Sequence, residues 1–277
     1  MSSKLVNRVA LITGAGRGVG KAIAMKLASE GASIVVNDLD ENVALETVNE
    51  IRGTGAAAVA CVGSVTAADF CDRFVATALE NFGSVDIVVN NAGFTWDSAI
   101  QKMTDEQWDS VLACHLTAPF RILRALQPVI RSLVKTDEDN QRRVVRKIVN
   151  VSSMAGMYGI PGQANYSAAK AGIIGMTRSL AKEWGRLNVT VNSVSYGLIN
   201  TRLTEASADN GSTIDIEGRQ VKVGVNSNLL SALQGMIPLG HIGTTEEAAG
   251  AVYLMCLPES DYISGHNLVC SGGLTGI

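Results

Sequence analysis

The chain has 277 residues, of which 47% are hydrophobic and 18% charged, and its formal net charge is −3 at pH 7. α/β folds often form a single unit of this length, and such a chain can bury a sizeable core. Its one cluster of positive charge comprises Arg142, Arg143, Arg146 and Lys147, which we interpret as a solvated face. Without a larger basic patch, nucleic acid is not expected as a partner.

The five cysteines are far apart and show neither a Cys-x-x-Cys pair nor a zinc-like spacing with histidine. We therefore expect reduced thiols and no metal site. The N-terminal residues carry no apolar signal core, and no later apolar run is long enough to span a bilayer. These features predict a soluble, cytoplasmic protein with no membrane partner.

The elements predicted along the chain alternate between short apolar runs, typical of buried strands, and helical patterns. The runs lie at 9–12, 33–37, 57–62, 87–90, 148–151, 189–194 and 267–270. This alternation predicts an α/β fold in which a doubly wound parallel sheet of about seven strands carries helices on both faces. No internal repeat or low-complexity tract interrupts it.

Two segments depart from the alternation. The polar run 136–143 lies between a helix predicted to end near Leu133 and the strand at Ile148, and we interpret it as a solvent-exposed extension. A tolerated surface insertion is favoured there over a partner site. The second segment, 204–242, begins with small and polar residues at 206–212 that predict a mobile loop.

The first strand is followed by a turn with glycine at positions 14, 16, 18 and 20, and then by a helix that begins near Gly18. Glycine lets the backbone approach a pyrophosphate closely, while a helix N-terminus offers unpaired N–H groups and a positive dipole end. The spacing does not fit Gly-x-Gly-x-x-Gly, but the position between a strand and a helix makes the signal strong. It predicts a nucleotide pyrophosphate site formed by Gly14, Gly16, Arg17, Gly18 and Val19.

Asp38 closes the second strand, where an acid can accept hydrogen bonds from the adenosine ribose. A carboxylate there would repel a 2′-phosphate, which favours NAD over NADP. Arg17 is the opposing signal, because it could serve a 2′-phosphate; it could equally contact the pyrophosphate or be solvated. Asp38 could also be the N-cap of the helix from Asn42 onward, which is compatible with either nucleotide.

Ser153, Tyr166 and Lys170 form a constellation in the middle of the chain. Tyr166 and Lys170 have i,i+4 spacing in a helical pattern, so both project from one face. A cation beside a phenol favours the phenolate and moves its pKa toward working pH, as a general acid/base needs. Ser153 ends a predicted buried strand, where open α/β sheets place ligands, and would donate a hydrogen bond there. Ser152 could take that role, but we interpret it as structural.

These motifs, taken together, resemble the short-chain dehydrogenase/reductase family in order and spacing: Thr13-Gly-x-x-x-Gly-x-Gly20, Asn90-Asn-Ala-Gly93, Ser153 and Tyr166-x-x-x-Lys170. The resemblance extends from Val9 to Gly273 and is strongest to the 3-oxoacyl-thioester reductase-like branch. It implies a Rossmann-type fold and one domain over residues 1–277. The cofactor half would occupy roughly 1–150, the catalytic and substrate half roughly 151–277, and a substrate lid roughly 201–242.

The resemblance implies an oxidoreductase that transfers a hydride between NAD, or else NADP, and a secondary alcohol or ketone. The substrate would be a 3-oxoacyl or 3-hydroxyacyl thioester or a cyclic ketone. Tyr166 would act as general acid/base, Lys170 would lower its pKa and hold the nicotinamide ribose, and Ser153 would polarise the carbonyl. The alternative is a nucleotide-binding regulatory or scaffold protein of the same fold without turnover. A homo-oligomer, usually a tetramer, is also expected from the family.

The resemblance assigns further cofactor contacts to loops at the ends of the strands. Small residues after the fourth strand would let the chain pass the ribose, a glycine after the sixth would turn under the nicotinamide, and two positions beyond it would meet the carboxamide and a phosphate. Ser64 stands where the family usually has an aspartate beside the adenine. The residues so assigned are Ser64, Val65, Asn91, Ala92, Gly93, Gly197, Ile199 and Thr201.

Two positions depart from the family pattern. His115 stands where the family has an asparagine in a proton relay, and our hypothesis is that it keeps the relay and adds a pH dependence. The alternative is a helix histidine satisfied by a backbone carbonyl, with no proton role. Tyr196 precedes Gly197 in place of the usual proline and could face the substrate.

Apolar residues near the lid imply an apolar substrate body, although packing explains them equally well: Met157, Tyr158, Ile160, Leu203 and Met236.

Overall fold

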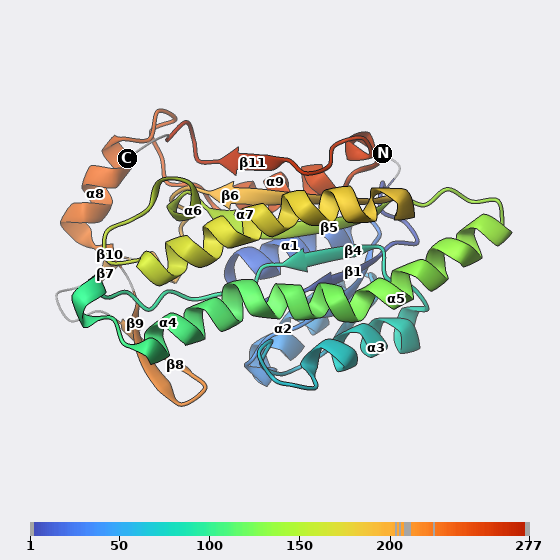
Figure 1. Ribbon diagram of the computed structural model, residues 1–277, viewed down its shortest axis with the longest axis horizontal. Helices are drawn as coiled ribbons and strands as arrows, with labels where there is room; N and C mark the ends of the chain where they lie inside the picture. The colour runs from blue at the N-terminus through green and yellow to red at the C-terminus, as the bar shows by residue number, and fades with distance from the viewer. Residues whose placement is uncertain (1–2, 203, 205, 208–211, 224, 275–277) are drawn as a thin grey trace.

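The computed structural model describes residues 3–202, 204, 206–207, 212–223 and 225–274. Its centre is a seven-stranded parallel sheet in the order β11-β6-β5-β4-β1-β2-β3 (Figure 1). This confirms the predicted sheet, and β5 and β6 extend beyond the apolar runs because their polar ends also pair, Ser153 opposite Tyr196. The strands are β1 (Val9–Ile12), β2 (Ser33–Val36), β3 (Ala58–Ala60), β4 (Ile87–Asn90), β5 (Arg146–Ser153), β6 (Val189–Tyr196) and β11 (Asn267–Cys270).

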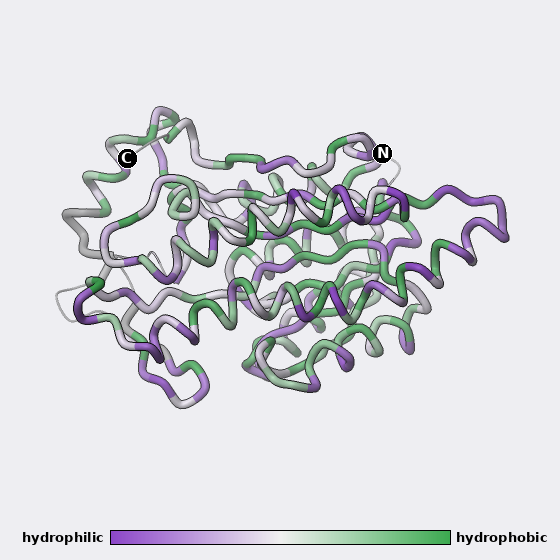
Figure 2. The backbone as a smooth tube through the Cα atoms, viewed as in Figure 1, coloured by the Kyte–Doolittle hydropathy of each residue, from purple (hydrophilic) through white to green (hydrophobic). Residues whose placement is uncertain are grey.

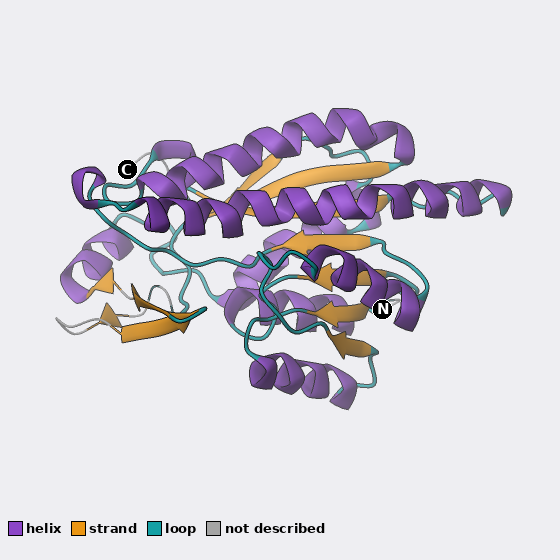
Figure 3. Ribbon diagram, turned by 60° about the horizontal axis from the view of Figure 1, so that its bottom comes forward, coloured by secondary structure: helices purple, strands orange, loops and turns teal. Residues whose placement is uncertain are grey.

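Helices cover both faces of the sheet (Figure 3). One core packs under α1 (Gly18–Ser29), α2 (Glu41–Gly53) and α9 (Thr245–Cys256), and the other under α3 (Phe70–Phe82), α4 (Asp105–Leu112), α5 (Ala118–Asp139) and α7 (Ala164–Trp184). Along β1, Ala10 and Ile12 enter the first core and Val9 and Leu11 the second, as the period of two requires. The predicted single-domain Rossmann-type fold is thereby confirmed.

Shorter helical turns connect these elements: η1 (Ile100–Lys102), the π-helical η2 (Ala113–Thr117), α6 (Ala155–Tyr158), η3 (Gly185–Leu187) and η4 (Pro258–Ser260). The π-helical turn η2 lies directly between α4 and α5. None of the helices in the described ranges combines the length and the apolar character that a membrane span requires.

The segment after β6 is more structured than the predicted loop. It contains the antiparallel hairpin of β8 (Ser212–Ile216) and β9 (Arg219–Val223), the parallel pair β7 (Ala206–Ser207) and β10 (Val225–Asn226), and α8 (Ser227–Gly235). The hairpin turn uses Glu217 and Gly218, both with positive φ. Glu217 accepts a hydrogen bond from Thr66 at 3.4 Å, and Arg219 donates to Glu106 of α4 at 2.8 Å. Positions 208–211 of the predicted mobile loop lie outside the described residues.

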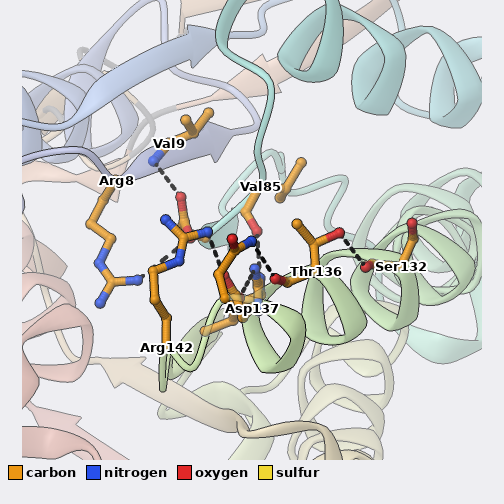
Figure 4. A network of polar contacts seen from close by, with 10 residues as sticks. Arg8, Val9, Val85, Ser132, Thr136, Asp137 and Arg142 are labelled. Atoms are coloured by element: carbon orange, nitrogen blue, oxygen red, sulfur yellow. Dashed lines mark hydrogen bonds and ion pairs between the residues drawn. The ribbon is translucent and has the colours of Figure 1, made fainter.

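The polar run 136–143 and the cationic cluster were only partly predicted. Helix α5 continues to Asp139 instead of ending near Leu133, and its far end is hydrophilic and projects from the body (Figure 2). Asp137 is nevertheless buried and accepts a hydrogen bond from Arg142 at 2.9 Å (Figure 4). It also accepts one from Arg146 at 2.8 Å. The prediction of a solvated face is therefore wrong for Arg146 and Lys147, which are each 3% exposed.

The burial of these two cations has a physical reason. Arg146 donates from Nε to the carbonyl of Val85 and from Nη2 to Asp137, so the cation is paired and hydrogen-bonded inside the fold. Its Nη1 is buried without a partner among the described residues. Lys147 forms an ion pair with Asp261 at 2.7 Å and donates to Ser260. Because β5 alternates between the two faces, a basic pair at its start sends one cation toward each layer.

We expect Arg146→Ala to lower the free energy of unfolding by about 3 kcal/mol, because it leaves the buried Asp137 and the Val85 carbonyl short of a donor. Arg142→Ala removes an arginine from the same carboxylate, but its side chain is 61% exposed, so the loss should be below about 1 kcal/mol. Urea unfolding of the two variants measures the difference. Equal losses would contradict the assigned importance of the buried pair.

Candidate active site

The turn between β1 and α1 has the shape of an anion cradle. Gly14 and Gly18 have positive φ, and a side chain at Gly14 would come within 2.9 Å of the Ala92 backbone. A Cβ at Gly20 would lie 2.0 Å from the Gly14 carbonyl, so the turn closes against the helix only with glycine. Helix α1 starts without a side-chain cap and without an acid in its first turn. Its first N–H groups and dipole therefore fit the pyrophosphate of a dinucleotide.

Two aspartates that follow β2 lie beside this turn. Asp38 accepts a hydrogen bond from the Gly16 N–H at 3.0 Å, so its carboxylate lies directly against the phosphate turn. Asp40, rather than Asp38, is the N-cap of α2 and accepts from the Asn42 N–H at 3.1 Å. Arg17 donates to the other oxygen of Asp40 at 2.7 Å. The predicted acid is thus at the predicted edge, and the alternative N-cap role belongs to its neighbour.

The loops after β3 and β4 complete the cofactor side. Asn91 donates from its side chain to the carbonyls of Thr13 at 2.9 Å and Gly14 at 3.1 Å, so this amide holds the glycine turn in place. Ala92 follows with its N–H on the Thr13 hydroxyl. The Ser64 hydroxyl is engaged in its own loop, where it accepts from the Thr66 N–H and shares a 2.8 Å contact with the Thr66 hydroxyl. Val65 is buried beside it.

Ser153, Tyr166 and Lys170 converge at the carboxyl end of β5. Lys170 projects from α7 and donates to the Val151 carbonyl at 2.7 Å, and its Nζ lies 5.5 Å from the centre of the Tyr166 ring. Burial raises the Tyr166 pKa to about 12, although a hydrogen bond with Ser153 opposes this. Burial also lowers the Lys170 pKa to about 8. The three groups meet as predicted, but desolvation raises the Tyr166 pKa, and the predicted lowering of this pKa by Lys170 is not found.

Ser152 and Ser153 make different contacts. Ser152 is buried and donates to the Lys170 carbonyl at 2.8 Å, which fixes α7 to β5. Ser153 is less buried, accepts from the Ala155 N–H at 3.1 Å, and is the serine that contacts Tyr166. Only Ser153 therefore presents its hydroxyl beside the phenol.

His115 lies inside the π-helical turn η2 with its ring edge-on to Tyr166, 5.0 Å between ring centres. Its Nε2 is 3.1 Å from the Phe94 nitrogen and 2.7 Å from the Phe94 oxygen, so it bonds the backbone of the loop after β4. Burial and the nearby Lys170 charge hold the His115 pKa well below its usual value, which leaves the ring neutral. The low pKa argues against the predicted pH dependence, and the contacts are those of the alternative, a histidine satisfied by the backbone. A proton-relay role for His115 stays a prediction.

The position of the His115 ring also explains why residue 93 is a glycine. A Cβ at Gly93 would lie 2.1 Å from the ring, so the loop can pass His115 only because residue 93 has no side chain. Nδ1 of His115 is buried without a hydrogen-bond partner among the described residues. Nε2 thus anchors the loop, while Nδ1 remains the ring atom with hydrogen-bonding capacity to spare.

The last residue of β6 is placed differently from the prediction, and the residues after it are closely packed. Tyr196 is buried in the core under α9 and donates its hydroxyl to the Ala248 carbonyl at 2.8 Å, so it faces away from any substrate. Gly197 is tightly packed, since a Cβ there would lie 2.8 Å from Ser271. Ile199 is buried and forms a bridge to Gly243, and the Thr201 N–H donates to the Thr204 hydroxyl at 2.9 Å.

The sequence prediction missed one polar group near Tyr166. Asp97 accepts a hydrogen bond from Gln163 at 2.8 Å, and the Ser98 N–H donates to the Gly162 carbonyl, so two loops meet beside the catalytic helix. Burial raises the Asp97 pKa above its usual value. The sequence signal that could have identified Asp97 was its position in the loop after β4, at the edge of the sheet where ligands bind.

Among the described residues, no group of His, Cys, Asp and Glu is arranged to hold a metal.

The fold and this site define a dinucleotide-binding enzyme with a tyrosine, a lysine and a serine at its centre. A family model described as short chain dehydrogenase matches residues 8–211. The chain is 38% identical to a 3-oxoacyl-[acyl-carrier-protein] reductase of Synechocystis sp., over 98% of both chains. It is 36% identical to the enzyme of that name in Vibrio cholerae, over 98% of both, and 34% identical to that in Chlamydia muridarum, over 99% and 100%. The chain belongs to the short-chain dehydrogenase family and is a nicotinamide-dependent oxidoreductase.

We expect kcat/KM for carbonyl reduction to fall as the pH rises through about 8, because Lys170 then loses the proton that stabilises a developing phenolate. Between roughly pH 5 and 7 the profile should be flat, since His115 is already neutral. His115→Asn, which keeps a donor and an acceptor for Phe94, should show the same profile. A limb near neutrality that disappears in His115→Asn would contradict the neutral ring.

We expect Tyr196→Phe to lower the free energy of unfolding by about 1 to 2 kcal/mol, because the Ala248 carbonyl loses a buried donor. KM for the carbonyl substrate should stay unchanged, since the hydroxyl points into the core. Chemical unfolding and steady-state kinetics of the purified variant measure both quantities. A raised KM with unchanged stability would place Tyr196 at the substrate after all.

Proposed function

We propose that this chain reduces a 3-oxoacyl thioester to the 3-hydroxyacyl thioester, with NADH as the favoured nucleotide. The observation that carries the proposal is the convergence of Ser153, Tyr166 and Lys170 beside an intact phosphate turn. Support for the thioester comes from relatives named 3-oxoacyl-[acyl-carrier-protein] reductase that match over nearly the whole of both chains.

Tyr166 is the proton donor in this proposal. A pKa of about 12 keeps its hydroxyl protonated at neutral pH, so it can give its proton to the substrate oxygen. Ser153 would donate a second hydrogen bond to that oxygen, and the Lys170 ammonium would stabilise the phenolate that remains. The nucleotide, when bound, supplies the hydride that the carbonyl carbon accepts. The same residues would accept the proton when an alcohol is oxidised.

The preference for NADH rests on the charges at the end of β2. Asp38 presents its carboxylate beside Gly16, where a 2′-phosphate would meet a like charge. Arg17, the residue that favours NADP, is already paired with Asp40. The remaining cofactor assignments, from Ser64 to Thr201, remain predictions from the family resemblance.

Turnover is favoured over the non-catalytic alternative because the departures from the family pattern leave the chemistry intact. His115 binds the Phe94 backbone through one ring nitrogen. Ser64 stabilises its own turn, and Tyr196 packs in the core. None of the three changes removes a group that would donate a proton or position the substrate oxygen.

An apolar substrate body fits the surface near the site. Met157, Tyr158 and Ile160, in and after α6, are 38%, 47% and 45% exposed, and Met236 after α8 is 51% exposed. Met157, Tyr158 and Ile160 would be covered by an acyl chain or by the proposed lid, 201–242, and Met236, which belongs to that lid, by the acyl chain. Leu203 lies outside the described residues. The homotetramer and the cytoplasmic location stay predictions.

The test is nicotinamide absorbance after mixing purified protein with a short 3-oxoacyl-CoA and either NADH or NADPH. We expect faster oxidation of NADH, and a loss of at least about 100-fold in kcat for Tyr166→Phe, which removes the proton donor but keeps the ring. Nucleotide binding without oxidation, for 3-oxoacyl-CoA and for cyclic ketones alike, would overturn the proposal in favour of the non-catalytic alternative.

A further inference from the structure

We propose that Asp40 is a specificity-determining residue for the nucleotide: it pairs with Arg17 and thereby makes the adenosine end of the site reject a 2′-phosphate. The inference rests on the proposed nucleotide site and deepens it. Asp38 alone repels a phosphate, but it leaves a nearby arginine that could still attract one. Asp40 removes that attraction.

Asp40 makes three polar contacts, two through its carboxylate and one through its backbone N–H. One carboxylate oxygen receives Arg17 at 2.7 Å, and the other accepts from the Asn42 N–H at 3.1 Å as the N-cap of α2. The Asp40 N–H donates to Asp38 at 3.2 Å. Because the capping contact orients the carboxylate and Asp38 holds the Asp40 backbone, the ion pair with Arg17 is built into the start of α2.

Arg17 lies where a 2′-phosphate would find it. It is the N-cap residue of α1, between Gly16, whose N–H bonds Asp38, and Gly18, beside which there is open space. Its guanidinium reaches across to the end of β2, where the ribose of a bound dinucleotide is expected. With Asp40 in place, a phosphate at this position would face two carboxylates and an arginine whose charge is already neutralised.

A second ion pair between α1 and α2 provides an internal comparison. Lys21 lies one turn further along α1 than Arg17, and it forms an ion pair with Glu50 near the end of α2. Glu50 is exposed to a similar extent as Asp40, with side-chain fractions of 50% and 47%. Removing either acid changes the net charge equally, but only Asp40 contacts the arginine beside Asp38.

The experiment measures the dissociation constants of NADH and NADPH by nucleotide fluorescence, without turnover, for four proteins. Asp40→Asn keeps the cap of α2 but releases Arg17, so NADPH should bind about tenfold more tightly while NADH changes little. Adding Arg17→Gln to Asp40→Asn should cancel the gain. Glu50→Gln, the matched control, should leave the ratio of the two constants unchanged.

The inference is overturned if Asp40→Asn affects both nucleotides equally, if the gain survives in the double variant, or if Glu50→Gln reproduces it. The proposed function fails separately. A wild-type protein that prefers NADPH contradicts the proposed NADH preference, yet the change of the ratio in Asp40→Asn still decides the role of Asp40. Binding of neither nucleotide refutes both.

Discussion

The contact between the β1–α1 turn and the loop after β4 is the constraint on which the site depends. The Thr13 hydroxyl receives the N–H groups of Asn91 and Ala92, and the Asn91 side chain returns to the Thr13 and Gly14 carbonyls. The same loop then passes Gly93 under the His115 ring, which lies edge-on to Tyr166. A continuous series of close contacts thus joins the turn between β1 and α1 to Tyr166, the proposed proton donor. A side chain at Gly14 would collide with the Ala92 backbone, and one at Gly93 would collide with the His115 ring.

Exclusion of water from the site sets the pKa values of its ionisable groups. Tyr166, Lys170 and His115 are driven toward their neutral forms by desolvation, which is the largest cause of each pKa shift. For Lys170 the folded pKa of about 8 lies below its ordinary value of 10.5, so the folded state binds fewer protons than the unfolded state between these values. Stability should therefore rise with pH across this window, and below it the buried lysine costs roughly 3 kcal/mol. Such a cost is consistent with a residue kept for catalysis instead of stability.

Local patterns predicted most of this structure, and tertiary pairing explains what they missed. The sequence alone predicted the features that depend on neighbours along the chain. These are the apolar runs of β1 to β4, the glycine turn between β1 and α1, and the spacing of Tyr166 and Lys170. Tyr196 was misplaced because its partner, the Ala248 carbonyl, is 52 residues away. Arg146 was taken for a surface cation because Asp137 is brought to it only by the packing of α5 against the sheet. The role of His115 likewise depends on the backbone of Phe94, which no spacing in the sequence reveals.

The net charge does not indicate what the charged residues of this protein do, because an arginine–aspartate pair has different effects in the core and at the surface. The pair of Arg146 and Asp137 is almost fully buried, so its value lies in avoiding an unpaired charge inside the fold. The pair of Arg17 and Asp40 has side chains 38% and 47% exposed, and water screens it enough to make its contribution to stability small. A weak ion pair can still control recognition, because an incoming phosphate must compete with the carboxylate for the same guanidinium. At the rim of the proposed site, charge pairing would therefore act on the choice of nucleotide, whereas in the core it acts on the stability of the fold.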